Sequence, residues 1–258
     1  MQRKIALGCF IIAISPALAA APASAFKDHG AMKGSCVGCH SLSREEAASV
    51  LKGMVDNVVA VIPGPFPGVW EVDAGIGGKV YPLYMDYSKK LLFQGNFFRV
   101  SDRENLTRLR YADLNRVDVS SIPLENAIVL GNPSSKRRLI VLTDPSCPHC
   151  VRLHGEIKTA IAKDPEVAFF VMPYPRNPGD RAVYAKCLAA VCDKSGKVLD
   201  DIYSGKEVPP AKCDSRAVDE TIRLADRLQI QGTPSMILPD GRVVSGYREA
   251  DELLSLTR

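Results

Sequence analysis

The feature that most constrains the fold of this chain is a pair of cysteines, Cys147 and Cys150, placed between a strand pattern and a helix pattern. Arg138–Thr143, just before the pair, is a nearly continuous apolar run, which is typical of a buried central strand. Val151–Ala162 has helical periodicity, and Val167–Met172 again has a strand pattern. Strand, helix and strand at this spacing predict a βαβ unit.

This position has a chemical consequence for the two thiols. Cys147 faces the unpaired amides and the positive dipole end of the helix, which favour thiolate over thiol. We therefore expect Cys147 to attack substrate disulfides and Cys150, one turn later, to resolve the mixed disulfide. Pro148 suits the first helical position, and a protonated His149 would add positive charge. The alternatives are an inert disulfide or half of a zinc site, although no second ligand pair with suitable spacing lies nearby.

The remaining elements fall into two groups separated by a charged connector. The C-terminal group is predicted to contain strands at Ile128–Leu130, Ser235–Leu238 and Arg242–Ser245 and helices at Asp180–Asp193, Ala217–Leu228 and Glu249–Leu256. The N-terminal group is predicted to contain a helix at Glu45–Ala60, capped by Ser43, and strands at Gly68–Asp73, Lys79–Met85 and Lys90–Gln94. One helix on a small sheet makes a thin core, which favours dimerisation. A second capping box at Ser101–Glu104 predicts the connector helix.

The first 25 residues have the pattern of a secretory signal peptide. Arg3 and Lys4 precede an apolar stretch, and Ala23-Ser24-Ala25 matches a cleavage site, so a mature chain should begin near Phe26. An uncleaved membrane anchor is the alternative. Export to a periplasm would allow stable disulfides. The net charge of +4 includes Arg3 and Lys4, so the mature chain is nearly neutral and gives no indication of nucleic-acid binding.

A resemblance to a known family rests on two motifs. CPHC follows a strand, and Gln231-Gly232-Thr233-Pro234 precedes a later strand, as in a thioredoxin fold with its cis-proline loop. The stretches TDPSCPHC and GTPSMILPDGRVVSGY are similar to those of the periplasmic DsbC/DsbG thiol:disulfide isomerases. The resemblance covers about Leu42 to the C-terminus. It implies that Thr233 and Pro234 bind the substrate backbone beside the redox pair.

The same resemblance implies an α+β fold class and a division of the chain. The chain would begin with the signal peptide (1–25) and an N-terminal segment (26–41). These would be followed by a cystatin-like dimerisation domain (42–100), a linker helix (101–121) and a thioredoxin-like catalytic domain with a helical insertion (122–258). The implied assembly is a V-shaped homodimer. The implied partners are misfolded exported proteins with disulfides and a DsbD-type membrane electron donor, and thiol exchange would need no cofactor.

One departure from this family concerns the residues between the cysteines. DsbC proper has Gly-Tyr there, whereas the Pro148-His149 pair resembles the oxidase DsbA, whose thiol pair is strongly oxidising. The dimerisation domain favours an isomerase or reductase, and the dipeptide favours a thiol oxidase. We favour the isomerase and keep the oxidase as the alternative. A chaperone without catalysis is a further hypothesis.

Three cysteines follow the redox pair. By resemblance, Cys192 and Cys213 form the structural disulfide of a DsbC-type catalytic domain. Closing a loop of about 20 residues would contribute roughly 3 kcal/mol. Cys187 is left over, either as a buried free thiol that packs like a small hydrophobe or as a competitor for Cys213.

A second C-x-x-C motif lies near the start of the chain. Cys36 and Cys39 are followed directly by His40, which is the attachment pattern of a c-type haem with His40 as an iron ligand. Such a haem would make the chain an electron carrier. A local disulfide and a second redox pair are the alternatives. The candidates for a second axial ligand are His29, Met32, Met54 and Met85.

Overall fold

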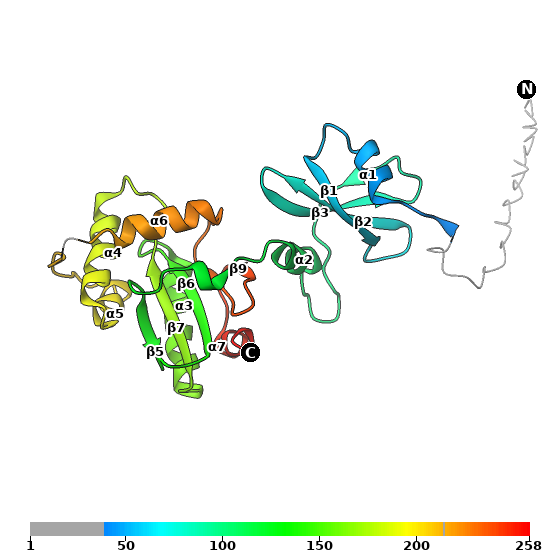
Figure 1. The fold of residues 1–258 in the computed structure, drawn as a ribbon. Helices are drawn as coiled ribbons and strands as arrows, with labels where there is room; N and C mark the ends of the chain where they lie inside the picture. Colours follow the sequence, from blue (N-terminus) through cyan, green and yellow to red (C-terminus); the bar gives the residue numbers. More distant parts are fainter. Residues whose placement is uncertain (1–38, 214) are drawn as a thin grey trace, which may run out of the picture.

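The computed structural model describes residues 39–213 and 215–258. It contains two units, each with its own sheet, and the helix α2 (Leu106–Leu114) lies between them (Figure 1). The predicted signal peptide, residues 1–25, and Cys36 lie outside the described residues. Within the part that is described, no helix is long and apolar enough to cross a membrane.

The N-terminal unit is a four-stranded antiparallel sheet in the order β1-β2-β3-β4. Its elements are α1 (Arg44–Val50), β1 (Asn57–Pro63), β2 (Val69–Ile76), β3 (Lys79–Asp86) and β4 (Leu92–Phe93). The helix α1 packs on the sheet through Ala47 and through its C-cap residue Leu51, which join Val72 and Met85 in one apolar cluster. This is the thin core that the sequence predicts for the unit.

The predicted helix at Glu45–Ala60 is correct at its start and wrong at its end. Ser43 caps the helix, and its hydroxyl accepts a hydrogen bond from the Glu46 amide at 3.1 Å. The helix ends at Val50, and β1 begins at Asn57, where we expected the last turn of the helix. The chain reverses at Gly53, which has φ +83°, a conformation that favours glycine. The β-branched residues that follow pair with β2, so tertiary pairing overrides the helical spacing.

The connector helix also begins later than its sequence predicts. α2 starts at Leu106, and Asn105 caps it by accepting a hydrogen bond from the Arg108 amide at 2.9 Å. The expected cap at Ser101 is wrong, because residues 100–102 form a turn and no helix begins there; Arg99, just before this turn, pairs with Asp102 at 2.8 Å. A short 3₁₀ helix, η2 (Val119–Ser121), follows α2.

A buried ion cluster joins α2 to the N-terminal sheet. Arg110 on α2 pairs with Asp73 and, at 2.9 Å, with Glu71, and both carboxylates lie on β2. The Asp73 side chain has no exposed surface. Burial and the neighbouring Asp73 raise the pKa of Glu71, and Arg110 opposes this rise. The helix α2 is therefore held to the sheet by a charge contact that is costly to break.

The C-terminal unit is a five-stranded mixed sheet in the order β5-β7-β6-β8-β9. Its strands are β5 (Ile128–Gly131), β6 (Arg137–Thr143), β7 (Val167–Pro173), β8 (Ser235–Ile237) and β9 (Val243–Ser245). Its helices are α3 (Pro148–Lys163), α4 (Arg181–Asp193), α5 (Lys197–Tyr203), α6 (Ala217–Arg227) and α7 (Ala250–Leu256). Strands β6 and β7 are parallel and joined by α3, which confirms the predicted βαβ unit. α3 and α7 contribute to the apolar cluster on one face of the sheet, and α6 contributes to the cluster on the other.

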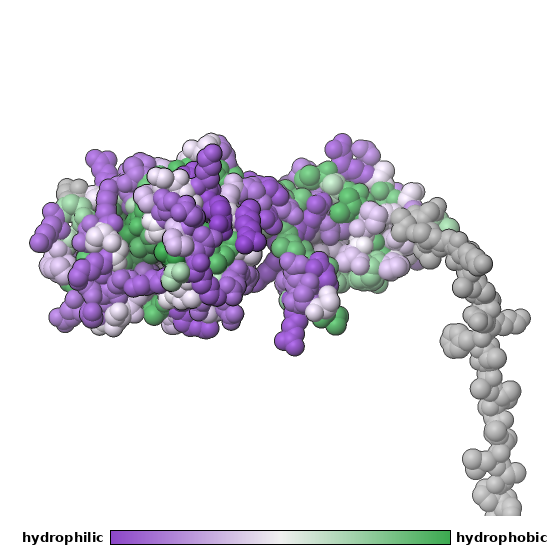
Figure 2. All heavy atoms as spheres, turned by 90° about the horizontal axis from the view of Figure 1, so that it is seen from below, coloured by the Kyte–Doolittle hydropathy of each residue, from purple (hydrophilic) through white to green (hydrophobic). Residues whose placement is uncertain are grey.

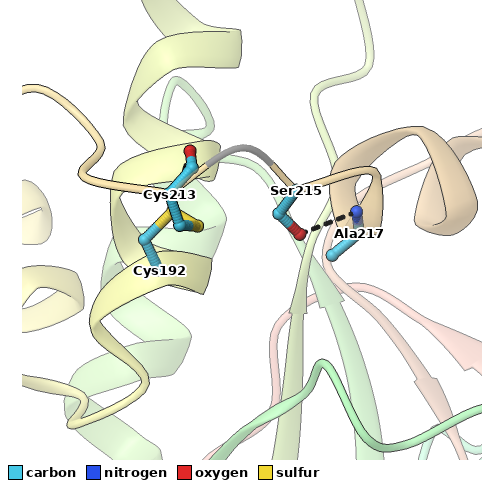
Figure 3. Close-up of a disulfide and its surroundings, with 4 residues drawn as sticks. All are labelled: Cys192, Cys213, Ser215 and Ala217. Carbon is cyan, nitrogen blue, oxygen red and sulfur yellow. Dashed lines mark hydrogen bonds between the residues drawn. A yellow bond between two sulfur atoms is a disulfide. The ribbon is translucent and has the colours of Figure 1, made fainter.

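Three helices, α4, α5 and α6, lie between β7 and β8 at one end of this unit (Figure 1). A disulfide joins Cys192 on α4 to Cys213, with Cα atoms 5.7 Å apart, as the resemblance implied (Figure 3). Cys187 is a free and fully buried thiol, so it does not take Cys213. The helix α5 lies inside the loop that the disulfide closes, and our sequence analysis missed it.

Candidate active site around Cys147 and Cys150

The first turn of α3 holds the redox pair in the position that the sequence predicts. Cys147 is the N-cap of α3, with φ −92° and ψ 117°, and Pro148 is the first helical residue. The Cys150 amide donates to the Cys147 carbonyl at 2.9 Å. Cys147 therefore stands directly before the free amides of the helix, and Cys150 lies one turn inside it.

Hydrogen bonds stabilise the thiolate form of Cys147. Burial by itself would raise the pKa of this thiol, because only 3% of the residue is exposed. The Thr233 side chain, the Cys150 amide and thiol, and the His149 amide all interact with the sulfur and outweigh burial, so the pKa of Cys147 is lowered. His149 thus contributes through its backbone, whereas the sequence suggested a contribution from its ring.

Cys150 has the opposite electrostatics. It is 1% exposed, and burial raises the pKa of its thiol to about 11. Hydrogen bonds from the Thr143 and Thr233 side chains and from the Asp144 amide, whose nitrogen is 3.4 Å from the sulfur, reduce this rise. The two sulfurs therefore favour different protonation states: Cys147 favours the thiolate, and Cys150 favours the thiol.

The loop before β8 lies opposite the redox pair. The peptide bond between Thr233 and Pro234 is cis, as the resemblance implied. The Cys147 sulfur lies 3.4 Å from the Thr233 carbonyl oxygen. The Thr233 hydroxyl is buried and has no hydrogen-bond partner of standard geometry among the described residues, and its nearness to the Cys147 sulfur helps to lower the pKa of that thiol. The structure thus brings together four of the residues singled out from the sequence.

A buried carboxylate that our sequence analysis missed shapes the loop before Cys147. Asp144 is 1% exposed and accepts hydrogen bonds from the Ser146 amide at 2.7 Å and the Ser146 hydroxyl at 2.6 Å. It also accepts from the Arg176 amide and from its guanidinium at 3.1 Å. Burial would raise the pKa of Asp144, but these hydrogen bonds lower it. The position of Asp144 immediately after a buried strand could have indicated a role at the site. Nothing in the sequence around Arg176 indicated one.

This geometry agrees with the comparisons with known proteins. A family model described as a thioredoxin-like domain matches residues 124–258. The thiol:disulfide interchange protein DsbC of Salmonella typhimurium is 31% identical over 174 residues, which cover 66% of this chain and 70% of that protein. The chain belongs to the DsbC family. The DsbC of Escherichia coli is 29% identical over 74% of this chain and 77% of its own length.

The match to another relative covers less of that protein. A probable DsbC of Bordetella avium is 29% identical over 72% of this chain, and the match spans 64% of the relative's length. Among solved structures, a disulfide interchange protein from Neisseria gonorrhoeae has a TM-score of 0.46 at 26% identity, covering 53% of this chain and 96% of that one.

Proposed function

We propose that this DsbC-family protein is a thiol:disulfide isomerase and reductase that uses Cys147 and Cys150. The observation that carries the proposal is the contrast between two cysteines one helical turn apart. The pKa of Cys147 is lowered at the helix start, and that of Cys150 is raised by burial. Enzymes that exchange disulfides need this asymmetry, because one sulfur must attack as a thiolate while the other stays protonated until the mixed disulfide has formed.

The reaction begins with the Cys147 thiolate. It attacks one sulfur of a non-native disulfide, the substrate's S–S bond breaks, and one substrate thiolate leaves. The Cys147–substrate mixed disulfide then has two fates. In isomerisation a second substrate thiolate attacks the substrate sulfur and releases Cys147 unchanged. In reduction the Cys150 thiolate attacks the Cys147 sulfur, which releases the reduced substrate and leaves Cys147 and Cys150 joined.

The substrate would bind beside the cis-proline loop. The Thr233 carbonyl oxygen lies 3.4 Å from the Cys147 sulfur, and Pro234 follows Thr233 in the chain. Val151, on the first turn of α3, is an exposed apolar residue, 39% accessible. Pro148 and His149 are exposed next to the nearly buried Cys147. A target disulfide must therefore approach closely along this loop, which suits an unfolded segment better than a folded surface.

Refolding of scrambled ribonuclease tests this function. Reduced protein should restore ribonuclease activity, and the Cys147→Ala variant should not. A Cys187→Ala variant is the matched control, because Cys187 is a free thiol buried between α4 and α6. If wild type recovered no more activity than Cys147→Ala, the proposal would be wrong.

The alternative is a DsbA-like thiol oxidase, which the Pro148-His149 dipeptide favours. The two activities differ in the reduction potential of the Cys147–Cys150 couple. Equilibration with glutathione buffers measures this potential. A value as high as about −120 mV, the figure known for a strong oxidant of this superfamily, would favour the oxidase.

We also propose that residues 42–100 form a dimerisation domain ahead of a linker at 101–121 and a catalytic domain at 122–258. Most of the exposed large hydrophobic residues in the described chain lie between residues 50 and 100. They are Val50, Met54, Val59, Phe66, Ile76, Leu91, Phe93, Phe98 and Val100. Figure 2 shows hydrophobic surface on the unit that contains β1–β4. Apolar residues gathered on one unit favour an interface with a second copy.

Light scattering coupled to gel filtration tests the dimer. The wild type should have twice the mass of one chain, and a Leu91→Glu/Phe98→Glu variant should be a monomer. Val151→Glu is the control, because it changes an exposed apolar residue of the C-terminal unit and should stay dimeric. Equal masses for all three proteins would contradict the interface.

The proposed location is the periplasm, and the proposed partners are exported proteins with non-native disulfides and a DsbD-type electron donor. Support comes from the signal-peptide pattern of residues 1–25 and from family membership. The electron donor is required by chemistry, since each reduction leaves the pair oxidised. Cell fractionation with an antibody against the C-terminal unit tests the location.

We propose covalent haem at Cys36, Cys39 and His40 as a separate function that thiol exchange does not require. Cys39 and His40 are exposed, and the His40 imidazole lies against Tyr87 with ring centroids 4.9 Å apart. Met85 is 1% exposed inside the N-terminal core, which removes it as a second iron ligand. Within the described chain, no three His, Cys, Asp or Glu side chains gather as a metal site. A pyridine haemochrome spectrum without a haem band would reject this function.

A further inference from the structure

A hydroxyl pair lies behind the resolving cysteine. Tyr203, the last residue of α5, is buried, and its hydroxyl hydrogen-bonds the Thr143 hydroxyl at the end of β6. The Thr143 side chain is also close enough to Cys150 to lower the pKa of its thiol, and the amide of the next residue, Asp144, donates to the Cys150 sulfur at 3.4 Å. The three polar groups therefore form a chain from α5 through the central strand to Cys150.

Neighbouring contacts fix Tyr203 in this position. The ring of His154, on α3, lies against the Tyr203 ring with centroids 4.8 Å apart. His154 Nε2 is 2.6 Å from Asp200 Oδ1, and Lys158 donates to the other oxygen of Asp200 at 2.9 Å. The helix α5 is thus tied to α3, the helix that starts with the redox pair. The Cys192–Cys213 disulfide closes the loop that contains α5.

Cys150 needs help at one step of the proposed reaction. Before it can attack the mixed disulfide it must become a thiolate, and burial opposes that charge. The other titratable groups near Cys150 are already paired with other residues or are buried, so they do not stabilise its thiolate. Asp144 is held by Ser146 and Arg176, and Cys187 is buried on α4. Besides the Asp144 amide, hydroxyl donors are then the groups positioned to stabilise negative charge on the Cys150 sulfur.

We propose that Tyr203 is a positioning residue that, through Thr143, stabilises the Cys150 thiolate while it resolves the mixed disulfide. The inference rests on the proposed function. Tyr203 donates its O–H to the Thr143 oxygen, so Thr143 turns its own O–H towards sulfur, and each hydrogen bond strengthens the next. No proton leaves either hydroxyl. The Cys150 proton passes to water, the new S–S bond forms to Cys147, and the Cys147–substrate bond breaks.

The two half-reactions can be timed separately with the aromatic disulfide DTNB. Attack by Cys147 releases one coloured thiolate, and attack by Cys150 on the resulting mixed disulfide releases a second. The reduced protein carries Cys36→Ser and Cys39→Ser, which removes the other thiols near the N-terminus, and mass spectrometry checks that Cys192–Cys213 stays joined. Stopped-flow absorbance then gives one rate for each step.

We expect Tyr203→Phe to slow the second release about tenfold at pH 7 and to move its pH midpoint up by about one unit. The first release should not change. Thr143→Val should slow the second release at least as much, whereas Thr143→Ser, which keeps the hydroxyl, should release the second thiolate at the wild-type rate. Adding Tyr203→Phe to Thr143→Val should slow the second release no further, because Tyr203 acts through Thr143.

Tyr174→Phe is the matched control. Tyr174 is another buried tyrosine of this unit, but its hydroxyl bonds the Ile230 carbonyl at 3.3 Å, so neither rate should change. An unchanged second rate in Tyr203→Phe, an equal slowing of both rates, or additive effects with Thr143→Val would overturn the role of Tyr203. A parent protein without a first release would instead overturn the proposed function itself.

Discussion

Removing the disulfide between Cys192 and Cys213 should destabilise the C-terminal unit by a calculable amount. The bond joins residues 21 apart in the chain. In the chain-entropy account, closing such a loop lowers the entropy of the unfolded state by about 11 cal/mol/K, or about 3.3 kcal/mol at 25 °C. With a urea m-value of about 2 kcal/mol/M, the unfolding midpoint of Cys192→Ser/Cys213→Ser should fall by about 1.6 M.

The single tryptophan gives this experiment an internal reference. Trp70 lies in the core of the N-terminal unit, so its fluorescence reports on that unit, whereas far-ultraviolet circular dichroism reports on both units. The double variant should shift the dichroism transition and leave the fluorescence transition in place. Cys39→Ser, which changes an exposed free cysteine, should shift neither. A midpoint change below about 0.5 M would show that loop closure is not the source of stability.

Three further predictions concern charged groups. Arg110→Leu removes the counter-charge of the fully buried Asp73 and should cost about 3–5 kcal/mol in urea unfolding followed by Trp fluorescence; a loss below about 1 kcal/mol would contradict the buried pairing. Because folding lowers the pKa of Asp144, its stabilisation is present above the unfolded pKa and is lost as pH falls through the folded one. Asp144→Asn should therefore flatten the acid side of the stability-versus-pH curve, and an unchanged slope would argue against it. Alkylation of Cys147 should have its pH midpoint below that of an ordinary thiol, about 8.5, whereas burial should keep the midpoint of Cys150 in Cys147→Ala above it. Equal midpoints would refute the asymmetry.

Sequence reasoning succeeded where one local pattern decides the structure. The strand before Cys147 and the helix after it follow from apolar periodicity over a few residues, and both are confirmed. It failed where a long-range contact competes with such a pattern. Val58 and its neighbours have helical spacing relative to α1, yet they pair with β2 as a strand. The energy of pairing across a sheet is invisible in a local window.

The missed helix α5 has a similar explanation. It is seven residues long, follows the N-cap Gly196, which has no side chain to cap it, and contains two adjacent aspartates. Its stability comes from Leu199, Ile202 and Tyr203, which pack into the core beneath α3. A short helix of this kind is marginal alone and forms because the tertiary structure buries one face of it.

The amino-acid sequence alone determined which sulfur precedes a helix and which lies one turn later, because helical geometry fixes the relative positions of two residues three apart. Only the tertiary structure decided what surrounds those sulfurs. The residues around them are Thr233, Asp144 with Arg176, and the Thr143–Tyr203 pair, which come from segments up to 86 residues from Cys147 in the chain. Thiol pKa values depend on burial and on such contacts over a few ångströms, and chain order does not encode those distances in any short motif.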